Sequence, residues 1–194
     1  MMSDMRENLK PTLWRTARTL ANADRLNLMR LVAKSDGEKG VVVLAEEANL
    51  PVPTASLYLR ALNARGLISV KRSGRFVYYG IRPDRSLPAS VRIQDAFRRL
   101  FARTALPEDW TERLIPVLRA YANPCREGIV RVLLQNGPLS YAELYRRSGL
   151  FEMTFLRHLH VLVSAEVVRR NEKDEYVLSR PRNSLSAAFL SSFD

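Results

Sequence analysis

Apolar residues recur at helical spacing through most of the chain, so the sequence predicts a mainly helical protein. In the first half this spacing predicts helices at about 9–21, 23–34 and 44–49. Two further amphipathic stretches, at about 89–105 and 108–121, predict long helices in the middle of the chain. Between these two groups of helices lies a stretch whose pattern changes within thirty residues.

That stretch begins with a short amphipathic helix at 53–65, which Gly66 ends because glycine readily adopts the left-handed conformation. Two runs of β-forming residues follow, at 68–70 and 76–81. They flank Ser73-Gly74, and a Gly-containing turn between two such runs predicts a β-hairpin. Lysine and arginine flank this turn, so the hairpin is expected to have a basic tip.

A short helix followed directly by a basic hairpin resembles the recognition helix and wing of a winged helix-turn-helix protein. The order of residues is similar to that of ArsR-like bacterial and archaeal repressors, whose helix usually reads Pro-Thr-x-Ser-x-x-Leu-x-x-Leu before Gly-Leu-Val. The matching positions here are Pro53, Thr54, Ser56, Leu59, Leu62, Ala64, Gly66, Leu67 and Ile68. In this fold Val41-Val42-Val43 would form a short strand that joins the wing. The resemblance implies a sequence-specific, double-stranded-DNA-binding transcriptional regulator, with recognition helix 53–65 in the major groove and basic wing 69–80 on phosphates.

A shift of about 100 residues aligns the second half of the chain with the first, which indicates an internal repeat. The aligned positions include Asn22 with Asn123, Arg25 with Arg126, Thr54 with Thr154, Leu59 with Leu159 and Leu62 with Leu162. The expected fold is therefore mainly α (an α+β winged helix), with two tandem winged helix-turn-helix domains linked by long helices. We expect a DNA-reading domain at 1–87, linking or dimerisation helices at 88–121, and a degenerate second domain at 122–194.

Composition and charge favour a polyanionic partner for the first half. The net charge is +11, and residues 1–87 carry 15 Lys and Arg against 8 Asp and Glu. Residues 108–194 carry 12 against 11, and the second hairpin has the acidic tip Asn171-Glu172-Lys173-Asp174-Glu175, which phosphates would repel. No apolar run approaches the roughly 20 residues of a membrane span, no signal sequence is evident, and a cytoplasmic, nucleoid-associated location is expected.

The candidate DNA contacts fall into two groups by their chemistry. Hydroxyl and guanidinium groups on the recognition helix can read base edges, although Thr54 and Ser56 could instead only cap that helix. Cations on and before the wing suit phosphates, although they could also form an ordinary solvated face. The expected DNA-binding residues are Thr54, Ser56, Leu57, Tyr58, Arg60, Arg65, Lys71, Arg72, Ser73 and Arg75.

Other chemistry is weakly represented in the sequence. Met153, Leu156 and His160 form an apolar strip on the second recognition helix, which we interpret as core rather than as a protein contact surface. The two histidines, His158 and His160, point to opposite sides of a helix, so no metal site is expected. Cys125 lies in a helical first turn, where a redox-sensing thiol is conceivable but an inert buried cysteine is favoured.

Nothing in the sequence indicates catalysis or a cofactor, and no small-molecule effector can be named. The family's dimers join through their first and last helices, so the middle helices could pair two copies within one chain or join two chains. A homodimer is the favoured interpretation here, because a chain with one DNA-binding domain would contact only one half-site of a two-fold symmetric operator. Two alternatives to a transcriptional regulator stay open: a tandem winged-helix adaptor of the chromosome-segregation type, or a replication or RNA-binding winged-helix protein.

Overall fold

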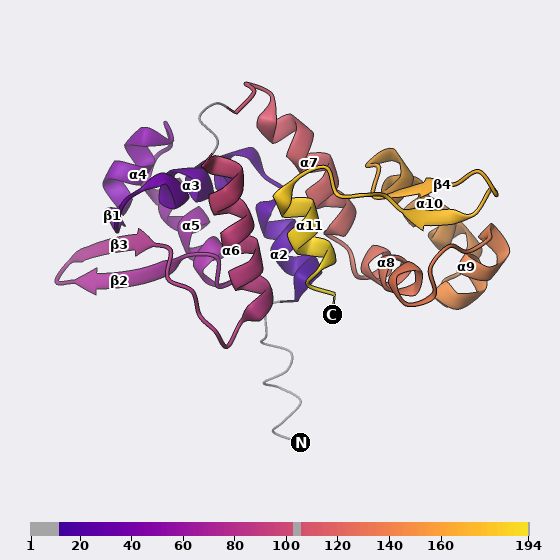
Figure 1. The fold of residues 1–194 in the computed structure, drawn as a ribbon. Helices are drawn as coiled ribbons and strands as arrows, with labels where there is room; N and C mark the ends of the chain where they lie inside the picture. The colour runs from indigo at the N-terminus through magenta and orange to yellow at the C-terminus, as the bar shows by residue number, and fades with distance from the viewer. Residues whose placement is uncertain (1–11, 103–105, 194) are drawn as a thin grey trace, which may run out of the picture.

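The computed structural model describes residues 12–102 and 106–193 and is mainly helical, with two small antiparallel sheets (Figure 1). This is an α+β winged-helix fold, as the sequence predicts. No described helix is both long enough and apolar enough to cross a bilayer.

The first part of the chain contains five described helices and a three-stranded sheet. The helices are α2 (Leu13–Leu20), α3 (Ala23–Lys34), α4 (Val41–Glu47), α5 (Val52–Asn63) and α6 (Pro88–Phe101). The strands β1 (Lys39–Gly40), β2 (Ser69–Ser73) and β3 (Phe76–Gly80) pair antiparallel in the order β1-β3-β2. The β2–β3 hairpin turns at Gly74, whose φ of 58° is the left-handed conformation that glycine adopts without strain.

The valine run at 41–43 is helical, so the expectation of a strand there is wrong. Strand β1 ends at Gly40, and Val41 begins α4. Leu44 and Ala45 are fully buried whereas Val42 and Val43 are exposed, an arrangement that a helix produces and an isolated strand at this site would not. Burial of Leu44 therefore outweighs the β-preference of valine.

The second part of the chain follows the same order of elements. Its helices are α7 (Trp110–Tyr121), α8 (Pro124–Asn136), α9 (Tyr141–Ser148), α10 (Glu152–Ser164) and α11 (Ser184–Leu190). Strands β4 (Val168–Arg170) and β5 (Tyr176–Leu178) form a hairpin. An isolated bridge between Leu139 and Tyr176 lies where β1 pairs with β3 in the first part.

Backbone conformation repeats along with element order. Left-handed φ angles occur at Asn49, Gly66 and Gly74, and again 100 residues later in each case, at Gly149, Glu166 and Asp174. Among the described residues Gly137 is the only other one with such an angle. At one of the second-half positions, Glu166, this conformation is therefore held by a residue other than the Gly, Asn and Asp that adopt it most readily.

An arginine at the start of α3 and another at the start of α8 make equivalent contacts. Arg25 donates from Nε to the Thr19 carbonyl, and its guanidinium lies 5.4 Å from the Tyr58 ring centroid. Arg126 donates from Nε to the Ala120 carbonyl at 2.7 Å, and its Nη1 lies 3.3 Å from His158 Nδ1. Burial lowers the pKa of both guanidinium groups, although they remain charged at neutral pH.

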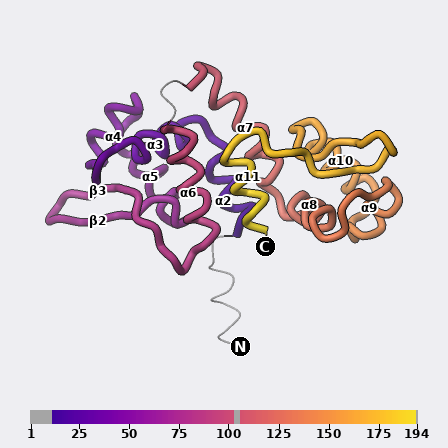
Figure 2. The backbone as a smooth tube through the Cα atoms, viewed as in Figure 1, coloured from indigo at the N-terminus to yellow at the C-terminus, as the bar shows by residue number. Residues whose placement is uncertain are grey.

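The two parts meet through their first and last helices. Helix α2 packs on α7, and α6 packs on α11, so these four helices form the middle of an elongated molecule (Figures 1 and 2). Helices α3–α5 with the first hairpin lie on one side of the middle, and α8–α10 with the second hairpin lie on the other. Aromatic contacts hold the four middle helices together: Phe101 of α6 lies edge-on to Trp110 of α7, and Tyr121 of α7 stacks on Phe189 of α11.

Candidate nucleic-acid interface

Helix α5 buries one face and exposes the other. Ala55, Leu59 and Leu62 are completely buried against the first part of the chain. On the opposite face Leu57 is 57% exposed and Arg60 is exposed as well. The helices that α5 contacts extensively are α2, α3 and α4, which all lie on its inner side. Its outer face is therefore open to solvent and to a large partner.

Thr54 and Ser56, the two residues of α5 with aliphatic hydroxyl groups, are half-buried. The helix begins at Val52 with Pro51 at the N-cap and no side-chain capping hydrogen bond. Within the described part of the chain, neither Thr54 nor Ser56 makes a side-chain hydrogen bond. The capping role considered for them is therefore absent, and both hydroxyls remain free to bond elsewhere.

Tyr58 lies differently from its helical neighbours. Its ring is half-buried beneath the Arg25 guanidinium, on the side of α5 that faces α3. Its ring therefore serves the packing of α3 on α5, whereas Leu57 and Arg60 point outward.

The hairpin β2–β3 presents an exposed basic tip. Lys71, Arg72, Ser73 and Arg75 are all exposed. Lys71 lies 3.4 Å from Glu38, which also pairs with Arg82 at 2.5 Å, so part of the positive charge at the hairpin base is neutralised. Arg72 and Arg75 have no ion pair among the described residues, and Arg75 lies over the exposed Phe76 ring. Positive charge is thus concentrated at the tip.

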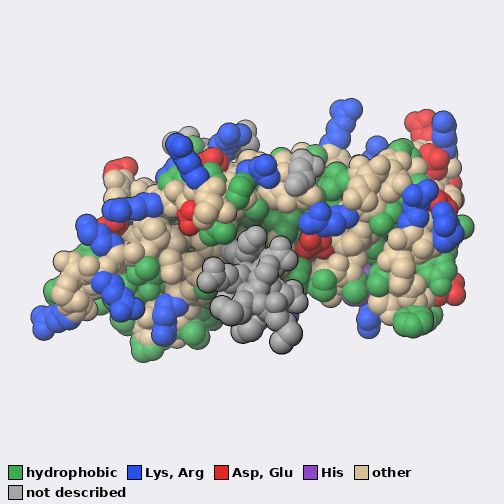
Figure 3. All heavy atoms as spheres, turned by 90° about the horizontal axis from the view of Figure 1, so that it is seen from below, with side chains coloured by type: hydrophobic (Ala, Val, Ile, Leu, Met, Phe, Trp, Pro, Cys, Tyr) green, Lys and Arg blue, Asp and Glu red, His purple; other side chains and the backbone are tan. Residues whose placement is uncertain are grey.

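Charge gathers unevenly over the molecular surface. On the face shown in Figure 3, basic side chains surround the end that carries β2–β3, and the densest group of acidic side chains lies at the opposite end, beside further basic ones. This distribution matches the counts along the sequence.

Arg65 lies away from the hairpin, in an arginine cluster beside α2. With Arg15, Arg18 and Arg25 it lines an open hollow of about 340 Å³ that also includes Trp14 and Thr19. Of these four arginines, the sequence predicts only Arg65 as a DNA contact. The polar face of α2, opposite the buried Leu13, Ala17 and Leu20, was the available signal for Arg15 and Arg18.

Helix α10 exposes the apolar side chains of Met153 and Leu156, whereas the outer face of α5 carries Leu57 and Arg60. Met153 is 77% exposed and Leu156 is 40% exposed, so the interpretation of this strip as core is wrong. Phe155, Leu159 and Leu162 fill the core instead, and Phe151 just before the helix is 88% exposed. The helical phase is shifted from the expected one because Phe155, and not Leu156, takes the inward position.

The second hairpin neutralises one of its cations, Arg170, and adds acidic residues at its tip. Arg170 pairs with Asp174 at 2.6 Å and donates to the Tyr176 hydroxyl. Asn171 Oδ1 accepts from the backbone N–H groups of Lys173 and Glu175, which fixes the turn without a glycine. The tip therefore offers no concentration of free positive charge.

The residues considered for metal or redox chemistry are separated. His158 is buried beside Arg126, and burial, with the nearby Arg126 and Arg157 charges, lowers its pKa. His160 is exposed, and no group of three or more His, Cys, Asp or Glu in the described part of the chain could hold a metal ion. Cys125 is half-exposed in the first turn of α8, so the expectation that it is buried is wrong.

Comparison with known proteins gives one informative relative. The chain is 35% identical over 79 residues to the HTH-type transcriptional regulator Rv0324 of Mycobacterium tuberculosis. The match covers 41% of this chain and 34% of that protein, so this chain spans only about a third of its relative. No protein-family model and no solved structure matches the chain.

Proposed function

We propose that this protein is a sequence-specific, double-stranded-DNA-binding transcriptional regulator whose reading head is α5 with the β2–β3 wing. The observation that carries the proposal is the exposed outer face of α5 beside an exposed tip with unpaired Arg72 and Arg75. A helix of this kind fits the major groove, and such a tip suits the phosphates beside it. The name of the matched relative supports the same function.

We further propose that the chain contains two ArsR-like winged-helix copies that pair with each other. The support is the repeated element order, the left-handed residues 100 positions apart, and the equivalent Arg25 and Arg126 contacts. The first helices pair with each other and so do the last helices, within one chain. We therefore propose an intrachain pseudo-dimer in place of the homodimer, because the helices that would join two chains are already engaged.

Neutralising the first hairpin tests the DNA-reading proposal. Duplexes selected from a random pool by the wild-type protein would be titrated at fixed salt by fluorescence anisotropy. Changing Lys71, Arg72 and Arg75 together to Gln should reduce binding to background. Changing only one or two of them should reduce the slope of log affinity against log salt concentration by about one for each cation removed. The matched control changes Arg169, Arg170 and Lys173 of the second hairpin to Gln, which removes the same charge. Equal losses from both hairpins would contradict the asymmetric reading head.

The pseudo-dimer is tested by mass in solution. We expect light scattering after size-exclusion chromatography to give the single-chain mass of 22.2 kDa for the free protein. In the complex we expect one protein chain per duplex. A stable two-chain particle without DNA would contradict the intrachain arrangement.

The exposed Phe151, Met153 and Leu156 favour a second role for α10. Exposed apolar side chains grouped on one helix are typical of protein contacts. In this proposal the first copy reads DNA and the second copy contacts protein, which also accommodates the adaptor alternative.

A further inference from the structure

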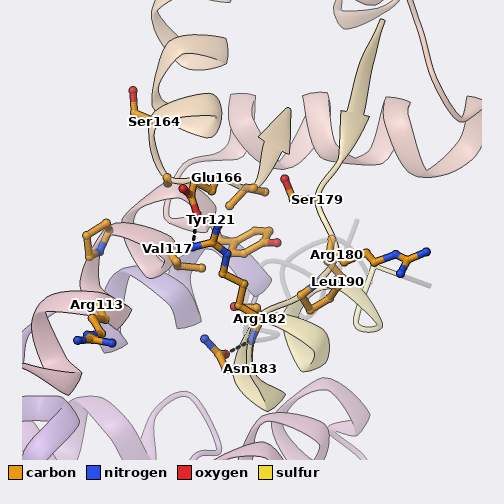
Figure 4. A pocket seen from close by; sticks show the side chains of 15 residues that line it. Arg113, Val117, Tyr121, Ser164, Glu166, Ser179, Arg180, Arg182, Asn183 and Leu190 are labelled. Atoms are coloured by element: carbon orange, nitrogen blue, oxygen red, sulfur yellow. Dashed lines mark hydrogen bonds and ion pairs between the residues drawn. The ribbon is translucent and has the colours of Figure 1, made fainter. Parts of the chain in front are cut away.

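A pocket of about 460 Å³ lies between the middle of the molecule and the second half. Its walls are α7, the turn between α10 and β4, and residues 179–190 at and before α11 (Figure 4). This volume is within the range of small-molecule sites.

The equivalent junction in the first half is closed. Ser90 Oγ donates to the Arg65 carbonyl at 2.8 Å, and Gln94 Nε2 donates to the Gly66 carbonyl at 2.9 Å. A Cβ atom on Gly66 would lie only 2.7 Å from Leu87 Cδ1, so α6 fits tightly against this turn. In the second half no hydrogen bond between described residues joins α11 to the turn at 165–167, and the pocket occupies that place.

Two hydroxyl groups in the pocket wall lack partners. Tyr121 is 2% exposed and Ser186 is 8% exposed, yet neither side-chain oxygen has a hydrogen bond to another described residue. The Tyr121 ring, stacked on Phe189, lies across the pocket with its hydroxyl on the side of Ser179 and Arg180 (Figure 4). Burial raises the pKa of the Tyr121 phenol, which therefore remains a hydrogen-bond donor at neutral pH. Neither hydroxyl oxygen is among the fully buried unsatisfied atoms of the described residues, so both are reached by solvent and are available to a ligand.

Positive charge exceeds negative charge at the pocket. Arg182 reaches across it and pairs with Glu166 at 2.6 Å (Figure 4). Arg113 and Arg180 lie at its edges; Arg113 pairs with Asp109 at 2.7 Å, whereas Arg180 has no ion pair among the described residues. Glu166 is the only acidic residue among the lining residues, and its φ of 55° is a strained conformation for a glutamate. Both members of the pair are more than half exposed, so an entering anion can take the place of the Glu166 carboxylate on Arg182.

We propose that this pocket binds a small organic anion, a monocarboxylate with an apolar body. The carboxylate would pair with Arg182, whose guanidinium can bind a carboxylate through two parallel N–H groups. It would also accept a hydrogen bond from the Tyr121 or Ser186 hydroxyl. The apolar body would lie on Pro116, Val117, Val167 and Leu190. This proposal concerns binding without DNA, so it stands or falls separately from the proposed regulator function.

Nuclear magnetic resonance of the whole ¹⁵N-labelled protein tests the site. Phenylacetate, hexanoate and indole-3-acetate would each be titrated in the absence of DNA, with the corresponding uncharged amides as matched probes. At least one acid should shift the backbone N–H signals of residues 165–167 and 183–186 saturably. The uncharged amide derivative of that acid should bind at least tenfold more weakly. Absence of saturable shifts there with all three acids, or equal binding of acids and amides, would overturn the proposal.

Two variants give opposite expected signs. Arg182→Gln should weaken binding at least tenfold, whereas Glu166→Gln should strengthen it several-fold because it removes the competing carboxylate. Arg157→Gln, an exposed arginine on α10 outside the pocket, is the charge-matched control and should leave binding unchanged. Spectra of the remaining amides show whether each variant is folded. Equal affinity in the Arg182 and Glu166 variants would contradict an anion site.

Discussion

Helices α3–α5 with hairpin β2–β3, and helices α8–α10 with hairpin β4–β5, build two similar units whose outer surfaces differ. The first exposes Arg60 on its helix and three cations on its hairpin, whereas the second exposes Met153 and Leu156 and an acidic hairpin tip. Their backbones bend at corresponding positions, and their buried leucines correspond. The comparison indicates that packing constrains the inner face of each unit, while the outer face is free to change chemistry.

The largest expected effect concerns the shared inner face. Leu62 and Leu162 are both fully buried on the inner sides of α5 and α10. Each change to Ala should lower the free energy of unfolding by about 2–5 kcal/mol, because it removes buried methyl groups and leaves a cavity. Urea denaturation followed by circular dichroism would measure this. The exposed Leu57→Ala is the control, expected within about 0.5 kcal/mol of wild type, and a negligible loss at either buried leucine would break the equivalence.

The next largest effect is on DNA affinity, and it distinguishes the outer face of α5 from that of α10. Arg60 and His160 occupy corresponding exposed positions on α5 and α10. If α5 reads the major groove, Arg60→Ala should cost about 1–3 kcal/mol of binding to a selected duplex, because one base contact is lost. His160→Ala should leave affinity unchanged in the same anisotropy titration. A similar loss from both substitutions would indicate that both helices touch DNA.

A smaller effect tests the helix caps that the two units share. Asn22 Oδ1 accepts from the Arg25 N–H at 3.0 Å, and Asn123 Oδ1 accepts from the Cys125 N–H at 2.9 Å. Replacing either asparagine by Ala should cost about 1 kcal/mol of unfolding free energy, because a helix N-terminus loses its side-chain acceptor. Thermal unfolding would detect this, and Asn136→Ala, at the end of α8, provides a control away from any N-cap.

The smallest effect is a pH dependence confined to the second unit. Burial lowers the pKa of His158 in the folded protein, so the unfolded chain binds the proton more readily. Stability should therefore fall as the pH decreases below the ordinary histidine pKa of about 6.5, and this loss should stop below the folded pKa. His158→Tyr, which copies the first unit's Tyr58, should flatten the profile. An unchanged slope in that variant would assign the dependence to other groups.

Much of the fold could be predicted because it depends on local pattern. The spacing of Ala55, Leu59 and Leu62 indicated α5, and Gly66 and the Ser73-Gly74 turn indicated its end and the hairpin. The exposed hairpin cations also followed from sequence, since charged groups at a turn rarely become buried. The strand expected at 41–43 failed because β-propensity depends on neighbours that the local sequence does not specify.

The candidate sites were less predictable than the elements that hold them. Leu156 and Phe155 are adjacent apolar residues, and which one points inward depends on how α10 rotates against α8 and α9. The arginine cluster around Arg65 and the pocket at Arg182 both join residues far apart in sequence. The spacing of apolar residues along the chain does not predict which distant residues come into contact.

The amino-acid sequence by itself determined the order of helices and hairpins, the chain reversals, and the concentration of basic residues in the first half. Each of these depends on interactions within a few residues or on a simple count. Only the tertiary structure decided that α2 pairs with α7 and α6 with α11, and that a pocket opens beside α11 where the first half is closed. These outcomes arise from side-chain shapes on helices distant in sequence, whose fit is settled only when their surfaces meet.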